Sequence, residues 1–88
     1  MNFEWDQAKA RKNERKHGVS FSDSTEVFGD DFSSCVLDPD HSDNEEQYIL
    51  FGMSAKGSYL VGSFTVRPNT IRIISAHRMT PSERKAYE

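Results

Sequence analysis

Hydrophobic and polar residues alternate over much of the C-terminal half of the chain, a pattern typical of half-buried β-strands. The densest stretch, residues 59–78, has two arms rich in Val, Ile, Tyr, Phe and Thr, and its centre reads RPNT, where Pro followed by Asn favours a turn. Antiparallel pairing across this turn predicts three facing pairs: Val66 with Ile71, Phe64 with Ile73, and Leu60 with His77. One face of this hairpin is then apolar and the other polar.

A second hairpin precedes the first. Residues 46–54 form an apolar-rich strand, and Gly57 lies in the following turn, where it can adopt a positive φ. A two-residue loop at Lys56-Gly57 would place Tyr48 opposite Thr65 and Glu46 opposite Arg67. Both hairpins then converge on one polar surface of the sheet, which would gather Glu46, Tyr48, Thr65, Arg67 and Arg72.

Helix signals lie at both ends of the chain. Asp6 is a candidate N-cap for a helix over residues 7–17, which Gly18 ends, and Ser20 or Ser22 caps a short second helix. Phe3 and Trp5 mark a short strand or an anchor on the core. Residues 33–37 form a short strand, residues 38–44 a loop, and the capping box TPSE begins a last helix over residues 81–87.

These elements predict an α+β fold: an antiparallel meander of about four strands, with the N-terminal helices and a short C-terminal helix packed on one face. The 88 residues suffice for a single domain, residues 1–88. The lone Cys35 excludes an internal disulfide, no signal peptide is evident, and no apolar run could span a membrane, so we expect a cytoplasmic protein.

Charge is unevenly distributed along the chain. The net charge is −3, yet residues 22–46 hold nine acidic residues and no Lys or Arg, whereas the segments before and after carry net charges of +2 and +4. Arg67, Arg72 and Arg78 fall on the predicted polar face with no carboxylate nearby except Glu46, which indicates an anion such as phosphate. Lys16 and His17 either complement the helix dipole or contribute to the anion site. The histidines and the acidic loop lack metal-ligand spacing, so we expect no metal and no cofactor.

Four segments together resemble one family. They are FEWDQAKARKNERKHGVSF, VFGDD, DHSDNEEQYILFG and RPNTIRIISAHRMTPSER, and their order is similar to that of the BrnT toxins. The resemblance implies a RelE-like fold and a ribonuclease toxin of a type II toxin–antitoxin system that inhibits translation. It also implies neutralisation by a BrnA antitoxin, through which operator DNA is bound. Three positions depart from the family pattern: His77 and Gln47 replace arginines, and Phe64 replaces a tyrosine.

A metal-free ribonuclease uses the substrate's 2′-hydroxyl as nucleophile, with a base, an acid and cations around the phosphate. We expect Arg67, Arg72 and Arg78 to hold the phosphate. Candidate bases or acids are Glu46, His17 and His77, and the residues expected to contact RNA are Lys16, Tyr48 and Thr65. The simpler interpretation of Glu46 and Arg67 is an ordinary cross-strand ion pair that contributes little. Two alternatives remain: a non-catalytic module that binds nucleic acid or protein through the same basic face, and a metal-dependent nuclease.

Overall fold

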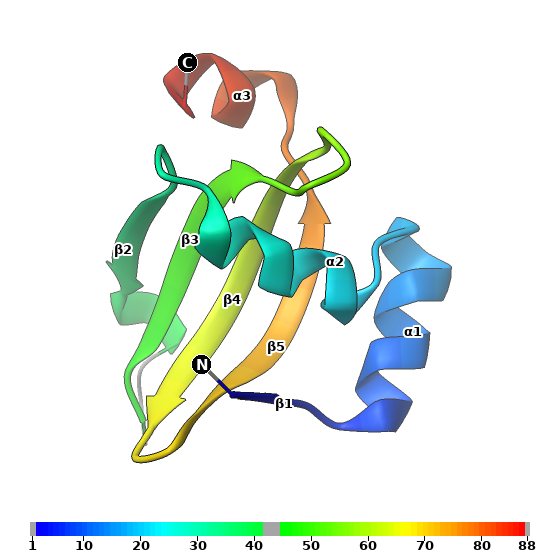
Figure 1. The fold of residues 1–88 in the computed structure, drawn as a ribbon, viewed down its shortest axis with the longest axis vertical. Helices are drawn as coiled ribbons and strands as arrows, with labels where there is room; N and C mark the ends of the chain where they lie inside the picture. The colour runs from blue at the N-terminus through cyan, green and yellow to red at the C-terminus, as the bar shows by residue number, and fades with distance from the viewer. Residues whose placement is uncertain (1, 42–44, 88) are drawn as a thin grey trace.

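Five strands form a single sheet in the computed structural model, which describes residues 2–41 and 45–87 (Figure 1). In chain order the elements are β1 (Phe3–Glu4), α1 (Gln7–His17), α2 (Phe21–Glu26), the 3₁₀ turn η1 (Val27–Gly29), β2 (Ser34–Asp38), the 3₁₀ turn η2 (Pro39–His41), β3 (Gln47–Met53), β4 (Tyr59–Arg67), β5 (Thr70–Arg78) and α3 (Pro81–Tyr87). Part of the predicted loop 38–44 lies outside the described residues. None of the described helices is long and apolar enough to cross a membrane.

The predicted helix ends are confirmed. The Asp6 carboxylate accepts a hydrogen bond from the third residue of α1, and Gly18 ends that helix with φ 69°. Ser20 caps α2 in the same way. The capping box of α3 is reciprocal: the Thr80 N–H donates to Glu83 at 2.8 Å, and the Glu83 N–H donates to the Thr80 hydroxyl at 3.2 Å. Local side-chain chemistry therefore fixes where each helix begins.

The sheet confirms the predicted α+β class. Strands β2 to β5 form the antiparallel meander, and the sheet order is β1-β5-β4-β3-β2. The segment around Phe3 is a strand as well as an anchor: β1 pairs in parallel with β5, and the Phe3 ring packs against Phe28. This fifth strand places Glu4 beside Arg72.

The 59–78 hairpin has the predicted turn. Val66 faces Ile71 and Phe64 faces Ile73, as expected from a two-residue loop. The predicted pair of Leu60 with His77 is wrong, because Leu60 faces Arg78. A β-bulge causes the difference: Ser63 pairs with Ser75 while Phe64 pairs with Ile73, which leaves one extra residue in β5 and shifts every later partner by one.

The register predicted for β3 and β4 is wrong by one residue. The loop contains three residues rather than two: the Ser54 N–H donates to the Ser58 carbonyl at 2.8 Å, and Gly57 has φ 85°. This geometry is a tight turn followed by a left-handed residue, the usual form of a three-residue hairpin. Tyr48 therefore pairs with Phe64, and Gln47 pairs with Thr65. Because side chains alternate, the slip moves Glu46 and Tyr48 to the opposite face of the sheet.

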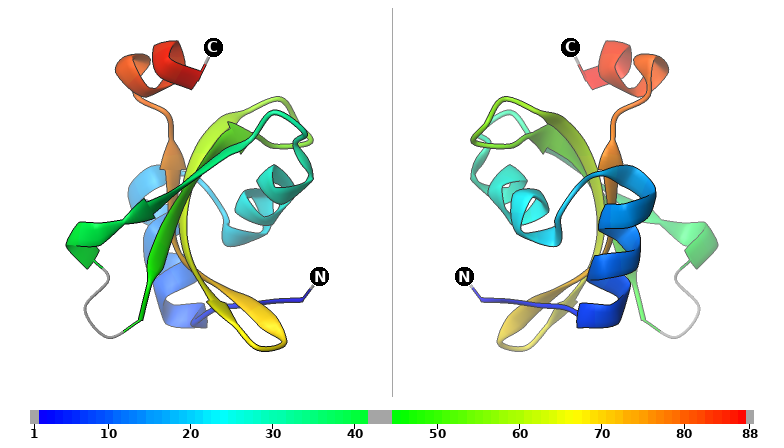
Figure 2. Two further views of the ribbon diagram at one scale, coloured as in Figure 1. Left: turned by 90° about the vertical axis from the view of Figure 1, so that its left-hand side faces the viewer. Right: turned by 90° about the vertical axis from the view of Figure 1, so that its right-hand side faces the viewer.

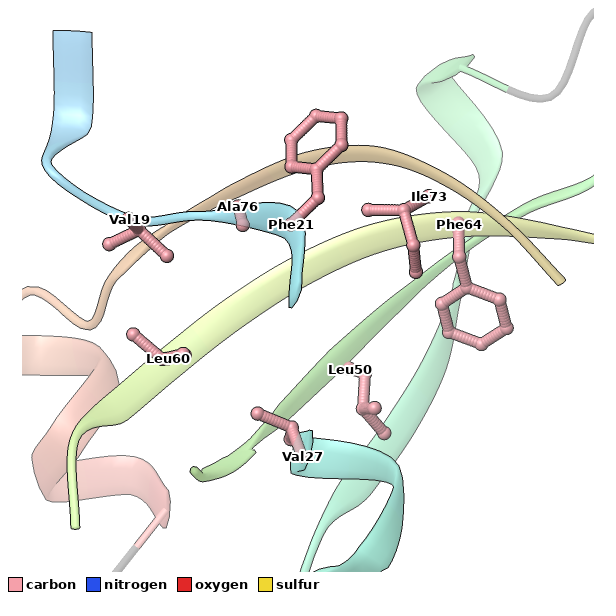
Figure 3. Packing of buried hydrophobic residues seen from close by; sticks show 8 residues of the cluster. All are labelled: Val19, Phe21, Val27, Leu50, Leu60, Phe64, Ile73 and Ala76. Atoms are coloured by element: carbon pink, nitrogen blue, oxygen red, sulfur yellow. The ribbon is translucent and has the colours of Figure 1, made fainter. Parts of the chain in front are cut away.

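The core lies between the concave face of the curved sheet and α2 with η1 (Figures 2 and 3). Its buried residues are Val19, Phe21, Val27, Leu50, Leu60, Phe64, Ile73 and Ala76. Two glycines permit the close approach. A Cβ on Gly62 would lie 2.6 Å from the Ser24 hydroxyl, and one on Gly52 would lie 2.6 Å from a Val27 methyl carbon. The opposite, convex face carries Arg67, Arg72 and His77.

The two other helices flank the sheet rather than covering the core. Helix α1 packs along β5, where the buried Asn13 amide bonds the backbone of Ala76 through both of its polar atoms. Helix α3 lies beyond the strand ends (Figure 1) and is tied down by the Tyr87 hydroxyl, which donates to Asp30 at 2.6 Å. The Arg84 guanidinium lies 4.2 Å from the Tyr59 ring centroid, which also fixes this helix.

Candidate functional site

Two polar clusters occupy opposite ends of the convex face. Alternation along β4 and β5 places Thr65, Arg67, Arg72 and His77 on this face. Arg72 pairs with Thr65, whereas His77 pairs with Val61. Those partners are four positions apart on β4, which corresponds to about 13 Å of extended strand. The predicted single site is therefore divided into two.

The first cluster, here called the ion-pair cluster, contains Glu4, Glu45, Arg67 and Arg72. The Arg67 guanidinium donates to both oxygens of Glu45, at 3.1 and 3.2 Å. Arg72 Nη1 lies 3.0 Å from Glu4 Oε2, and Arg67 Nη1 lies 3.9 Å from Glu4 Oε1. The expectation of arginines with no carboxylate besides Glu46 is wrong, because two glutamates from distant parts of the chain neutralise them.

Charge balance limits what the ion-pair cluster can bind. Two guanidinium groups face two carboxylates, so the local net charge is zero. The hydrogen bond from Arg67 lowers the pKa of Glu45, which keeps that carboxylate ionised. Thr65, on the same face, is 2 % exposed, and among the described residues its hydroxyl has no hydrogen-bond partner. An incoming phosphate would compete here with carboxylates that already pair with the guanidinium groups.

Glu46 and Tyr48 belong to the other face. The Tyr48 hydroxyl donates to Glu46 at 2.8 Å, and this bond raises the pKa of Tyr48. The Tyr48 ring stacks on Phe64 with centroids 5.5 Å apart, at the border of the core. The predicted pair of Glu46 with Arg67 is therefore wrong, and Glu45 takes that place. The one-residue slip in the β3–β4 loop is the cause.

The second cluster, here called the histidine cluster, contains His17, His77 and Glu83. His17 ends α1 and His77 lies near the end of β5, and their rings are 5.9 Å apart. The Nε2 atom of His77 lies 3.5 Å from Glu83 Oε1. Burial acts to raise the pKa of Glu83, but bonds from Thr80 and the nearby His77 outweigh it and lower that pKa. Two imidazoles and one ionised carboxylate thus meet at three chain segments.

Cationic side chains border the histidine cluster. Arg78 follows His77 in β5, and its guanidinium lies near Gly18, 3.7 Å from where a Cβ on that glycine would be. Lys16 is exposed in the last turn of α1, next to His17. The prediction that Arg78 shares the polar face with Arg67 is wrong, because Arg78 pairs with the core residue Leu60 and so starts from the opposite face, at the other end of the β4–β5 ladder. Two imidazoles with adjacent cations can perform acid–base chemistry on a phosphate.

Three carboxylates near the candidate residues were missed from the sequence. Glu4 reaches Arg72 through a parallel pairing of β1 and β5, and no local pattern indicates that pairing. Glu45 was missed because the β3–β4 register was one residue off. The sequence predicts Glu83 as part of a capping box, but its second contact, with His77, depends on the tertiary structure.

Comparison with known proteins gives a consistent picture. Residues 5–83 match the family described as "Ribonuclease toxin, BrnT, of type II toxin-antitoxin system". Among solved structures, the chain is similar to the ribonuclease toxin BrnT of Brucella abortus, determined by crystallography at 1.1 Å resolution. The TM-score is 0.66 at 20 % sequence identity, over 91 % of this chain and 97 % of that one, which shows a shared fold. No curated protein matches the sequence.

Proposed function

Because the chain belongs to the BrnT family of ribonuclease toxins of type II toxin–antitoxin systems, we propose that it is a metal-independent endoribonuclease whose acid and base are His17 and His77. The observation that supports this assignment is the 5.9 Å separation of the two imidazole rings, with Glu83 beside His77. Imidazole is the side chain that exchanges protons near neutral pH. Cleavage of cellular RNA would inhibit translation, and a BrnA antitoxin would neutralise it.

In the proposed reaction, one neutral imidazole removes the proton from the RNA 2′-hydroxyl. The resulting oxygen attacks the adjacent phosphorus, and the other imidazole, protonated, gives its proton to the departing 5′-oxygen. The products are a 2′,3′-cyclic phosphate and a 5′-hydroxyl. Arg78 and Lys16, which border the cluster, would stabilise the negative charge that develops on the phosphate.

Arg67 and Arg72 receive a different role in this proposal. Both are held by Glu4 and Glu45 at one end of the convex face, where Arg72 lies about 13 Å along the strands from the level of His77 and Arg67 lies further still. We assign them to the RNA backbone away from the reacting phosphate, because a phosphate there competes with bound carboxylates. Their loss then raises KM more than it lowers kcat.

The test compares rates of RNA cleavage in EDTA for four variants. His17→Ala and His77→Ala each lower kcat by about 10²–10⁴-fold, the usual contribution of one acid or base. The matched control is His41→Ala, which removes the chain's third histidine and leaves kcat unchanged. Arg67→Ala raises KM while kcat is largely retained.

Three outcomes would contradict the assignment. Full cleavage by both histidine variants would remove the acid–base role, and a large loss of kcat in Arg67→Ala would return the reaction to the ion-pair cluster. A wild-type chain that binds RNA without cutting it is the third outcome: cleavage restored by His77→Arg would then assign the reaction to an arginine at this position, and no cleavage by either would make the chain a binding module.

A further inference from the structure

The two edges of the sheet differ in how they are protected. At the β5 edge, β1 covers one end, and Asn13 of α1 bonds the N–H and carbonyl of Ala76 further along. At the other edge, β2 pairs with β3 on one side, and within residues 2–41 and 45–87 no strand pairs with its other side (Figure 1). One edge is thus closed by the chain's own residues, and the other can accept another strand.

The sequence of β2 lacks the usual features of a protected edge. Its five residues, SCVLD, include no Lys, no Arg and no Pro, and four of the five are exposed. Val36 is 46 % exposed and Leu37 is 48 % exposed, and these neighbours point to opposite faces of the sheet. Phe32, just before the strand, is 83 % exposed. Natural edge strands are normally protected by charge, especially lysine, or by proline; the single charge within β2 is Asp38 at its end, so the apolar centre of this edge indicates a binding surface.

A groove adjoins this edge on the convex side. It has a volume of about 480 Å³ and runs between the β2–β3 strands and helix α3. Its apolar lining includes Phe32, Val36, Phe51, Ala86 and Tyr87. The groove is therefore placed to receive every second side chain of a strand that pairs with β2. Leu37, on the other face, remains available to the intervening side chains.

The charge around the edge selects the partner. Asp30, Asp31, Asp38 and Asp40 flank β2 on both sides in sequence, and residues 22–46 contain no Lys or Arg. A second copy of the chain would bring the same carboxylates against this acidic rim, which is unfavourable. A segment with apolar residues flanked by Lys or Arg fits both the groove and the charge.

We propose that the antitoxin binds this toxin by adding a β-strand to the free edge of β2, through an extended apolar segment flanked by basic residues. Strand addition is favoured over a helix in the groove, because exposed apolar side chains lie on both faces of β2 and a helix would cover only one. The proposed docking site depends on family membership and on the edge, groove and charge described above, and does not depend on the proposed ribonuclease chemistry. A segment bound in the groove would also contact Glu83 of α3, which lies beside His77, and would thereby inhibit RNA cleavage. This inhibition rests also on the proposed function.

The experiment measures the affinity of the purified cognate antitoxin for the full chain and for three lysine variants. Val36→Lys and Leu37→Lys place a charge on either face of the edge, and each should weaken binding by at least about tenfold. The matched control is Val66→Lys, an equally drastic change at a 59 % exposed valine near the far turn of β4. RNA cleavage by each variant and its circular dichroism spectrum verify folding separately from binding.

Hydrogen exchange of the wild-type complex provides a test that needs no variant, since strand addition protects amides within residues 34–38. Weaker binding by both edge variants, with that protection, supports the proposal. A loss confined to Val36→Lys would place the antitoxin in the groove without strand pairing and overturn it. Unchanged affinity in both variants would overturn the proposal. A dimer of the toxin alone that dissociates in either variant would also overturn it, because a second copy of the chain would then occupy the edge.

Discussion

Asn13 is the polar residue on which the position of α1 depends most. Its side-chain N–H groups donate to the Ala76 carbonyl at 2.8 Å and the Val19 carbonyl at 3.1 Å, and its oxygen accepts from the Ala76 N–H at 3.2 Å. All three bonds are buried. Asn13→Ala removes them together and leaves backbone groups without these partners, so we expect the chain to lose a substantial part of its stability.

The magnitude follows from the number of bonds. A typical net contribution of about 1 kcal/mol for each hydrogen bond gives a loss of about 3 kcal/mol. A domain of this length unfolds with a free energy of about 4–13 kcal/mol, so the loss is large. At 4–8 °C per kcal/mol, the melting temperature should fall by roughly 12–24 °C.

Urea unfolding followed by circular dichroism measures this loss. The control is Lys12→Ala, which shortens an exposed side chain on the neighbouring position of α1 and should change the unfolding free energy by less than about 0.5 kcal/mol. Asn13→Asp separates packing from hydrogen bonding. It keeps the size of the side chain but places a carboxylate oxygen where the amide N–H groups donate to the Val19 and Ala76 carbonyls. The loss of unfolding free energy in Asn13→Asp should equal or exceed the loss in Asn13→Ala. A loss below about 1 kcal/mol for both would refute the reasoning.

Three further predictions concern packing, pH and the histidine cluster. Gly52→Ala places a Cβ 2.6 Å from a core methyl carbon and should destabilise the chain by about 1–3 kcal/mol in urea unfolding; unchanged stability would contradict that packing. The bond between Tyr87 and Asp30 raises the pKa of Tyr87 to about 12 and lowers that of Asp30. The tyrosine's contribution to docking α3 is thus complete below its ordinary pKa and lost as pH rises through about 12. The aspartate's contribution is lost as pH falls through its lowered pKa. The helical circular dichroism signal should follow both steps, and Tyr87→Phe should abolish the alkaline one. Glu83→Gln keeps a side chain able to complete the capping box, so it should slow RNA cleavage through His77 while leaving the urea midpoint unchanged, and a shifted midpoint with normal cleavage would assign Glu83 to the cap alone.

Local chemistry made much of the fold predictable. The caps at Asp6, Gly18, Ser20 and Thr80 depend on contacts within one turn of helix, and each signal is visible in a short stretch of sequence. The 59–78 hairpin was predictable for the same reason, because Pro and Asn define its two-residue turn. The family resemblance was confirmed over residues 5–83.

The candidate site was less predictable, because single-residue events decide which face a side chain occupies. Gly57 adopts a left-handed conformation in a three-residue loop. Because of this loop, Glu45 lies beside Arg67 instead of the predicted Glu46. The bulge in β5 moved Leu60 from His77 to Arg78. Contacts between distant segments, such as His17 with His77, depend on the assembled tertiary structure.

The most direct test of the proposed chemistry uses two RNA substrates that differ by one atom. The purified chain is incubated in EDTA with an RNA oligonucleotide and with the same oligonucleotide carrying a single 2′-deoxy nucleotide at the cleaved position, and the 3′ ends are identified by mass spectrometry. The account predicts a 2′,3′-cyclic phosphate from the first substrate and no cut at that position in the second. Cleavage of the deoxy substrate at that position, or cleavage that EDTA abolishes, would contradict attack by the 2′-hydroxyl without a metal.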